Sequence, residues 1–267
     1  MKSKILVLIS IISCVFSIKA QDFEVSPVDL KFTAEPGQTQ SIPISITNHA
    51  NKNAAFNVIL ADFIVNKEGT KVTMPPATTE HSLVNWLSIN PPFLELSPNE
   101  TRQVIVSIQA PVGDYSTKWA HIFIRSTNEQ TALIADKSTQ TGLNVLGQIV
   151  LTAYQSPKSN MNYKMKIAAL SEVSTLTDTL RRFNAKIDNM GDKITNCKVS
   201  LLASNLSNAD ETLLQVLEFS SFPDSQKEVY FEFKKNALPP GKYALAAILD
   251  YGKQSTLEGS QILIDVE

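Results

Sequence analysis

Cysteine is scarce in this chain of 267 residues, which contains only Cys14 and Cys197. Cys14 lies in an apolar N-terminal segment that we interpret below as a leader, so the rest of the chain has one thiol and no intrachain disulfide. A domain of this size folds without a disulfide when it buries enough apolar surface. We therefore expect Cys197, which alternates with Val199 and Leu201, to be a buried structural thiol.

Positive charge is scarce as well. The chain has 24 Lys and Arg against 26 Asp and Glu, a net charge of −2, and three of the lysines lie in the leader. Proteins that bind nucleic acid need a basic surface to neutralise phosphates. We therefore expect no nucleic-acid partner.

Motifs that carry chemistry are absent. The three histidines, His49, His81 and His121, are far apart and have no neighbours at metal-ligand spacing. The sequence has no nucleophile elbow, phosphate-binding loop or dinucleotide fingerprint. We expect no catalytic residue, no metal and no cofactor, and hence a protein that is not an enzyme. The alternative is an enzyme with a scattered site, because carboxylates can meet in three dimensions without a sequence signal.

Residues 1–20 have the features of an export signal. Lys2 and Lys4 precede an apolar run, and Ala20 is a small residue before a polar one. We predict a signal peptide over 1–20 with cleavage after Ala20. The less favoured alternative is lipid attachment at Cys14, because residues 11–14 resemble a lipobox. No later segment has the ~18 apolar residues of a spanning helix, so we expect no transmembrane span in the mature chain.

Period-2 alternation of apolar side chains recurs along the mature chain, and no segment shows a long helical period. The alternating sets are Ile42, Ile44 and Ile46; Val104, Val106 and Ile108; Phe183, Ala185 and Ile187; and Val229, Phe231 and Phe233. Many short strands at this spacing are typical of β-sandwiches. The sequence therefore predicts an all-β fold.

One arrangement occurs twice. Residues 111–115 (PVGDY) and 239–243 (PPGKY) share a pattern, and each lies between two apolar strands. The flanking strands are expected at 102–109 and 116–125 in the first copy, and at 227–234 and 244–250 in the second. In Greek-key sandwiches a corner tyrosine packs inward and its hydroxyl bonds to nearby backbone. We predict this role for Tyr115 and Tyr243; the alternative is two unrelated turns.

The repeat implies two consecutive immunoglobulin-like sandwich domains after the signal peptide. A short polar segment with a proline, 156–160, is the expected linker. We place the first domain at 21–157 and the second at 158–267.

The first half carries several further short motifs in a fixed order. They are Phe23-Glu-Val-Ser-Pro27, Pro36-Gly-Gln-Thr-Gln40, Trp86, Pro91-Pro-Phe93, Leu96-Ser-Pro98 and Tyr154-Gln-Ser-Pro157. Together they resemble the N-terminal domain of PapD-like periplasmic chaperones, and two sandwiches fit the layout of that family. The opening motif is also similar to immunoglobulin-like domains of WxL-interacting surface proteins. The leader, which ends in Lys-Ala-Gln, resembles signal peptides of the Bacteroidota.

The resemblance to PapD-like chaperones implies a binding mechanism. Such chaperones lend an edge strand of the first domain to an incomplete pilin, and two cations hold the pilin's C-terminal carboxylate. The matching positions here are Lys31 and Thr152, so one cation is kept as lysine and the other is lost. A single lysine holds a carboxylate less firmly than two cations do.

The expected lending strand is 143–154. It has apolar side chains on both faces, with Val145, Ile149, Leu151 and Ala153 on one and Leu146, Val150, Thr152 and Tyr154 on the other. The resemblance makes Lys31, Val145, Ile149, Leu151, Thr152 and Ala153 the expected partner-binding residues. The alternative is an ordinary last strand, buried on one side.

The strand expected at 116–125 is also apolar on both faces. One face carries Trp119, His121 and Phe123 and the other carries Ala120, Ile122 and Ile124, whereas a half-exposed strand would have a polar outer face. Either an insertion in the first domain covers this face or a partner does.

These observations predict a chaperone-like protein of the periplasm or cell envelope that binds partner proteins by edge-strand addition. Pilin-like subunits or components of outer-membrane secretion are the expected partners. The alternative function is a structural accessory or adhesive module of an outer-membrane assembly. Periplasmic location is expected, with lipid anchoring at Cys14 or surface exposure as alternatives.

Overall fold

The structure is a computed structural model that describes residues 22–127, 147–175, 177–252 and 257–267. The predicted signal peptide and Val145 lie outside the described residues. In the described part of the chain no helix has the length and apolar character needed to cross a membrane.

The chain is all-β, as predicted, with two short 3-10 turns, η1 (Val84–Trp86) and η2 (Lys235–Ala237). The first ten strands are β1 (Phe23–Ser26), β2 (Asp29–Phe32), β3 (Thr39–Asn48), β4 (Ala54–Val65), β5 (Lys71–Met74), β6 (Leu87–Asn90), β7 (Phe93–Leu96), β8 (Thr101–Gln109), β9 (Lys118–Thr127) and β10 (Gln148–Gln155). The others are β11 (Met165–Glu172), β12 (Leu180–Asn189), β13 (Thr195–Asn205), β14 (Glu211–Ser221), β15 (Gln226–Lys234), β16 (Gly241–Asp250) and β17 (Glu258–Val266).

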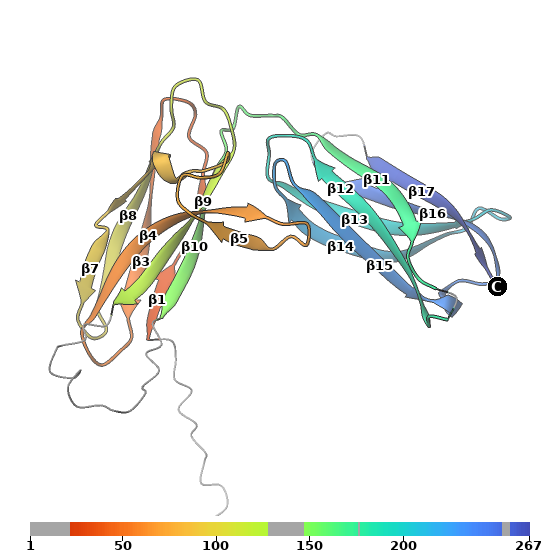
Figure 1. Cartoon of the computed structure of the whole chain (residues 1–267), viewed down its shortest axis with the longest axis horizontal. Coiled ribbons are helices and arrows are strands. Elements are labelled where there is room, and N and C mark those ends of the chain that lie inside the picture. Colours follow the sequence, from red (N-terminus) through yellow and green to blue (C-terminus); the bar gives the residue numbers. More distant parts are fainter. Residues whose placement is uncertain (1–21, 128–146, 176, 253–256) are drawn as a thin grey trace, which may run out of the picture.

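These strands form two sandwiches (Figure 1). In the first, the sheet β1-β3-β8-β6 packs on the sheet β2-β10-β9-β4-β5, in which β7 also pairs with β4. In the second, β11-β12-β15 packs on β14-β13-β16-β17. Among the described residues no sheet takes strands from both sandwiches. A domain boundary at 157/158 is compatible with this topology and stays a prediction.

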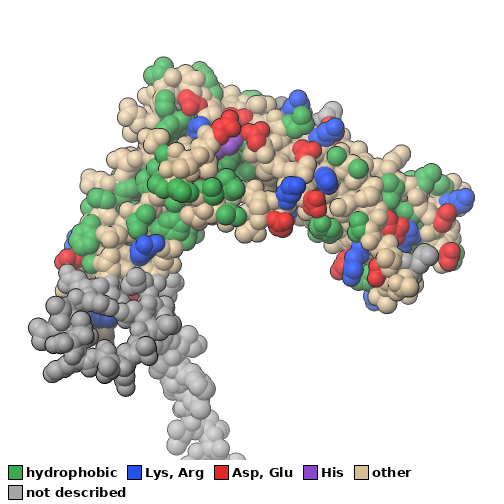
Figure 2. Space-filling view, in the orientation of Figure 1, with side chains coloured by type: hydrophobic (Ala, Val, Ile, Leu, Met, Phe, Trp, Pro, Cys, Tyr) green, Lys and Arg blue, Asp and Glu red, His purple; other side chains and the backbone are tan. Residues whose placement is uncertain are grey.

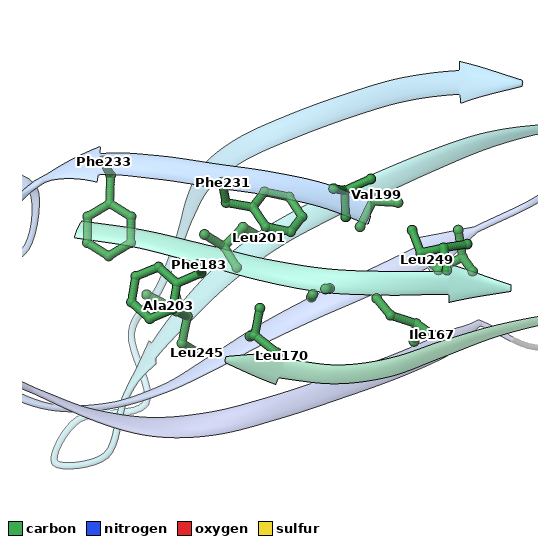
Figure 3. Packing of buried hydrophobic residues seen from close by; sticks show 14 of the residues in the cluster. Ile167, Leu170, Phe183, Val199, Leu201, Ala203, Phe231, Phe233, Leu245 and Leu249 are labelled. Atoms are coloured by element: carbon green, nitrogen blue, oxygen red, sulfur yellow. The ribbon is translucent and has the colours of Figure 1, made fainter. Parts of the chain in front are cut away.

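Each sandwich has its own apolar core, built by the alternation seen in the sequence. Val104, Val106 and Ile108 on β8 are at most 1% exposed. In the second core, Phe183, Phe231 and the other labelled side chains lie between the two sheets (Figure 3). Cys197 is buried there, and burial raises the pKa of its thiol to about 12. The prediction of a buried structural thiol is confirmed.

The two tyrosines of the repeated motif differ. Tyr243 is 3% exposed and its hydroxyl donates to the carbonyl oxygen of Pro239 at 2.9 Å, as expected of a corner. Tyr115 is 55% exposed, so the prediction of a buried corner there is wrong. The reason is its position: Tyr243 lies within β16, where alternation turns it inward, whereas Tyr115 precedes β9. Its backbone is engaged, because Asn160 Nδ2 donates to its carbonyl oxygen.

This difference predicts unequal effects of removing the two hydroxyls. Tyr243→Phe leaves the Pro239 carbonyl without its donor and should lower the free energy of unfolding by about 1 kcal/mol. Tyr115→Phe is the matched control and should change it by less than about 0.5 kcal/mol. Urea unfolding followed by circular dichroism measures both, and equal effects would contradict the assignment.

Candidate functional site

The strand β10 is paired along its whole length on one side only. It is antiparallel to β9 over residues 148–155, whereas the parallel strand β2 covers only 152–155 on its other side. Residues 148–151 therefore have one strand neighbour in the described part of the chain. This segment, which we name the open edge, is the candidate functional site.

Backbone polar groups point out of the open edge at alternate residues. The N–H of Ser126 on β9 donates to the carbonyl of Gly147, and the N–H of Thr152 donates to Val28 on the opposite side. Because orientation alternates along a strand, the N–H and C=O groups of Gln148 and Val150 face away from β9. Unpaired groups of this kind are a template for another strand.

The burial of the β10 side chains shows that the expected partner-binding face was assigned wrongly. Leu151 and Ala153 are fully buried in the first sandwich's own core, so they are not available to a partner and their assignment was wrong. Ile149 is half-buried against the same core. Alternation showed which residues share a face, but it could not show which face the opposite sheet covers. Val150, on the other face, is 42% exposed.

An apolar row extends across the outer face of the sheet to the open edge. Ile59, Phe123 and Val150 are direct neighbours on β4, β9 and β10. Ile59 is 38% exposed, and Phe123 is half-buried. The next row places Arg125 beside Gln148, whose side-chain oxygen accepts bonds from Arg125 Nε and Nη2. Figure 2 shows hydrophobic side chains gathered on the face where β4, β5 and β9 lie in Figure 1.

An insertion covers the other half of this outer face. The β4–β5 hairpin places the Phe63 ring on His121 at a centroid distance of 4.3 Å, and Trp119 Nε1 donates to the Phe63 carbonyl at 2.8 Å. Trp119 and His121 are consequently buried. Of the two alternatives for the apolar face of this strand, cover by the first half of the chain therefore applies to His121, whereas Phe222 of the second sandwich also packs on Trp119.

The two positions expected to hold a carboxylate are not equivalent. Lys31 on β2 is exposed and lies opposite Tyr154 of β10 in the parallel pair. Thr152 is buried, and Lys71 Nζ of β5 donates to its hydroxyl at 3.4 Å. The same ammonium donates to the Tyr154 hydroxyl at 2.7 Å. Sequence analysis missed Lys71, because only the turn of the hairpin brings it to β10.

The hairpin and its neighbouring loops also join the two sandwiches. Phe63 and Trp119 form a small apolar cluster with Phe222 of the second sandwich. At the tip of the hairpin, Lys227 Nζ donates to the carbonyl of Glu68 at 3.0 Å. These contacts hold the β4–β5 hairpin against the second sandwich (Figure 1).

Polar bonds reinforce this junction. Thr117 donates its N–H to the carboxylate of Asp192, and its hydroxyl donates to the Asp192 carbonyl at 2.6 Å. His81 lies 3.2 Å from the Asp224 carboxylate. Desolvation raises the pKa of Asp192 despite its hydrogen bonds.

Side chains that could hold a metal ion are not clustered in the described residues. No cluster of three or more His, Cys, Asp or Glu side chains occurs there. A surface hollow of about 490 Å³ borders Cys197, but a thiol with a pKa of about 12 is not a nucleophile at neutral pH.

The open edge predicts an alternating pattern of amide exchange. The amides of Gln148 and Val150 should exchange at least ~10-fold faster than those of Ile149 and Leu151, whose N–H groups face β9. Thr152, which donates to Val28, is the internal control and should be protected. Hydrogen exchange followed by NMR reads each amide. Equal protection along 148–151 would show that the edge is not open.

The burial of His121 under the β4–β5 hairpin predicts that the folded protein loses stability in acid. Burial, with a contribution from the Lys71 charge, lowers the pKa of His121 from 6.5 to about 4. Between these values the unfolded chain binds a proton that the folded chain does not, so stability falls as pH falls from 6.5 towards 4. The loss should be roughly 3 kcal/mol at about 1.4 kcal/mol per pKa unit.

Urea unfolding at a series of pH values tests this. His121→Gln removes the titrating ring and should flatten the dependence between pH 4 and 6.5. His49→Gln, at a half-exposed histidine, should leave it unchanged. A slope that survives in His121→Gln would assign the acid sensitivity to another group.

Comparison with known proteins gives a likeness in structure only. No known protein-family model matches the sequence, and no curated protein is significantly similar to it. A solved structure from a chaperone–tip adhesin complex in CFA/I fimbriae biogenesis is 11% identical, with a TM-score of 0.50, and the match covers 90% of this chain and 97% of that one.

Two further solved structures have lower TM-scores. The class 5 fimbriae chaperone CfaA is 13% identical with a TM-score of 0.44, covering 90% of this chain and 98% of that one. The CsuC–CsuE chaperone–tip adhesion subunit complex of Acinetobacter baumannii is 10% identical with a TM-score of 0.43, covering 78% and 89%. The match with a TM-score of 0.50, together with the strand topology, gives the chain the PapD-like, all-β fold that the sequence predicted.

Proposed function

We propose that this protein is an exported, non-enzymatic envelope protein that binds partner proteins by accepting a β-strand at the open edge of β10. The observation that carries the proposal is the backbone of Gln148 and Val150 on β10, which has no strand partner away from β9 among the described residues, because β2 pairs with β10 only from residue 152. The PapD-like fold supports it, as does the leader expected at residues 1–20. Pilin-like subunits or outer-membrane secretion components are the partner class that we favour.

Strand addition suits this edge energetically. An added strand pairs its backbone with Gln148 and Val150, and its side chains extend the apolar row of Ile59, Phe123 and Val150. Backbone pairing supplies affinity that depends little on sequence. The apolar row supplies preference for partner strands with an apolar residue beside Val150.

The substitution Val150→Pro tests the proposal by removing a single backbone N–H group. Proline removes the N–H that faces the open edge, and it leaves intact the bonds from Ile149 and Leu151 to β9. Partner binding should fall about tenfold, because one backbone hydrogen bond and its geometry are lost at roughly 1.4 kcal/mol. Val150→Thr keeps the N–H and the branched shape, so it is the matched control.

The measurement is site-specific photocrosslinking in the cells that export the protein. A photoreactive residue replaces Gln148 in the wild-type, Val150→Pro and Val150→Thr backgrounds, and another replaces Lys166 on the second sandwich as a position control. Crosslinks at 148 that weaken only with proline support strand addition. Equal yield in a folded Val150→Pro variant would reject it.

The alternative function is a structural accessory or adhesive module. The exposed apolar pair Ile64 and Val72, opposite each other on the β4–β5 hairpin, favours it. This function predicts crosslinks at Val72 rather than at Gln148.

A further inference from the structure

A histidine of the first sandwich lies between two groups that only accept hydrogen bonds. His81 Nδ1 is 2.8 Å from the carbonyl oxygen of Thr117, and His81 Nε2 is 3.2 Å from a carboxylate oxygen of Asp224 in the second sandwich. Neither a carbonyl nor an ionised carboxylate can donate, so both contacts are hydrogen bonds only when both ring nitrogens carry a proton. The arrangement therefore fits the charged imidazolium and not the neutral ring.

The first sandwich holds the His81 ring in place. The ring stacks on that of Trp119 at a centroid distance of 4.4 Å and an interplanar angle of 13°. The backbone of His81 is held as well, because its carbonyl oxygen accepts the N–H of Trp119 at 2.9 Å. The side chain is 15% exposed. Stacking and burial together keep Nε2 directed towards the second sandwich.

Asp224 is presented by a tight turn of the second sandwich. The N–H of Ser225 donates to the carbonyl of Phe222 at 3.2 Å, and Asp224, at the third position of this turn, has a φ of 55°. Glycine or asparagine is usual at such a position, so an aspartate there stores backbone strain, which is commonest at functional sites. The same turn packs Phe222 on Trp119 at a centroid distance of 5.2 Å. The turn and His81 therefore meet on one tryptophan.

The charges around the ring come from both sandwiches. They are Asp192 and Asp224 of the second sandwich, with Asp188 and Lys193 next to them, and Glu80 and Lys118 of the first. Burial is the main reason why the pKa of Asp192 is raised, and the charge of Asp224 raises it further, whereas that of His81 lowers it. Asp192 also accepts the N–H of Thr117, whose carbonyl is the partner of His81 Nδ1. A positive charge on His81 thus faces two carboxylates of the second sandwich.

We propose that His81 and Asp224 form a pH-sensitive clasp between the two sandwiches, closed while both ring nitrogens are protonated and released when Nε2 loses its proton. Histidine is the side chain whose charge ordinarily changes between pH 5 and 8. As pH rises, Nδ1 keeps its proton on the Thr117 carbonyl, so the proton leaves Nε2. The lone pair of Nε2 then faces the Asp224 carboxylate, and the contact becomes repulsive.

The clasp acts in the opposite sense to the burial of His121. It is present in acid and lost as pH rises, whereas the buried His121 ring destabilises the fold as pH falls. Release leaves the sandwiches joined, because the contact of Phe63 with Phe222 and the bond from Lys227 to the Glu68 carbonyl contain no imidazole. The expected consequence is a junction that is rigid in acid and more mobile above neutral pH. This inference does not depend on the open edge.

The protonation of His81 can be read directly by NMR. Long-range proton–nitrogen spectra of the imidazole distinguish the charged ring from each of the two neutral tautomers. At about pH 5.5 the ring should carry both protons, and at about pH 8.5 it should be neutral with its proton on Nδ1. A neutral ring protonated on Nε2 would contradict the clasp, because that form keeps its bond to Asp224.

Residual dipolar couplings measure whether the two sandwiches move as one body. In the full-length mature protein at about pH 5.5, couplings from both sandwiches should fit a single alignment tensor. At about pH 8.5 the equilibrium between closed and released forms should shift about tenfold, the equivalent of one hydrogen bond to a charged group. The two sandwiches should then need different tensors.

Two substitutions remove the pH sensitivity in different ways. Asp224→Asn places an amide that can accept from a protonated Nε2 or donate to an unprotonated one, so a single tensor should fit at both pH values. His81→Gln removes the titrating group, so its couplings should not depend on pH. His49→Gln is the matched control, because His49 lies 3.1 Å from Glu24 within the first sandwich, and it should behave as wild type.

The pattern across these proteins decides the proposal. Loss of the common tensor at about pH 8.5 in wild type and in His49→Gln, but not in Asp224→Asn, supports the clasp. A single tensor at both pH values in wild type overturns it. So does a pH dependence that survives in folded Asp224→Asn or His81→Gln, because the change would then belong to another group such as Asp192.

Discussion

The incomplete pairing of β10 is the constraint on which the rest of this structure depends. A strand inside a sheet satisfies its backbone groups on both sides, and β10 does so only from Thr152 to Gln155, where β2 runs parallel to it. Gln155 is also buried and bonds through its side chain to the backbone of Ala34. One end of the strand is thus fixed in the sandwich, while at the other end Gln148 and Val150 have no second strand neighbour within the described ranges. Natural sheets usually protect such edges, and this departure is the reason why we propose that the segment binds a partner strand.

The part of the outer face that the β4–β5 hairpin covers ends next to the open edge. The β4–β5 hairpin buries His121 and Trp119, and the cover ends at the row of Phe123 and Val150. The open edge and the bare apolar row therefore coincide. A partner that adds a strand gains both backbone bonds and apolar contact, without displacing any part of the described chain.

The hairpin has a second role because its tip reaches the other sandwich. Lys227 and Glu228 bond to backbone carbonyls of Glu68 and Lys67, and Phe222 packs on Phe63. The element that holds Lys71 over Tyr154 is thereby braced at both ends.

Local patterns predicted most of the fold and little of the site. Alternation is a property of a few consecutive residues, so it located β8, β9, β15 and β16 to within three residues of their observed bounds. Which face of β10 is covered depends on the opposite sheet, and for that reason Leu151 and Ala153 were assigned to a partner. Lys71 depends on the path of a hairpin some eighty residues away from Thr152 in sequence.

Tyr115 and Tyr243 end the same sequence motif but differ in burial, because the two loops that carry them have different surroundings. In the second sandwich the loop before β16 only needs to turn the chain, so its tyrosine can bond to Pro239. In the first, the loop before β9 lies at the junction, where Thr117 is fully buried and bonds to Asp192 of the second sandwich. The backbone there is held by contacts between sandwiches, which makes an internal tyrosine anchor unnecessary. The same junction brings Phe222 of the second sandwich to Tyr154 near the end of β10, so it also fixes the paired end of that strand.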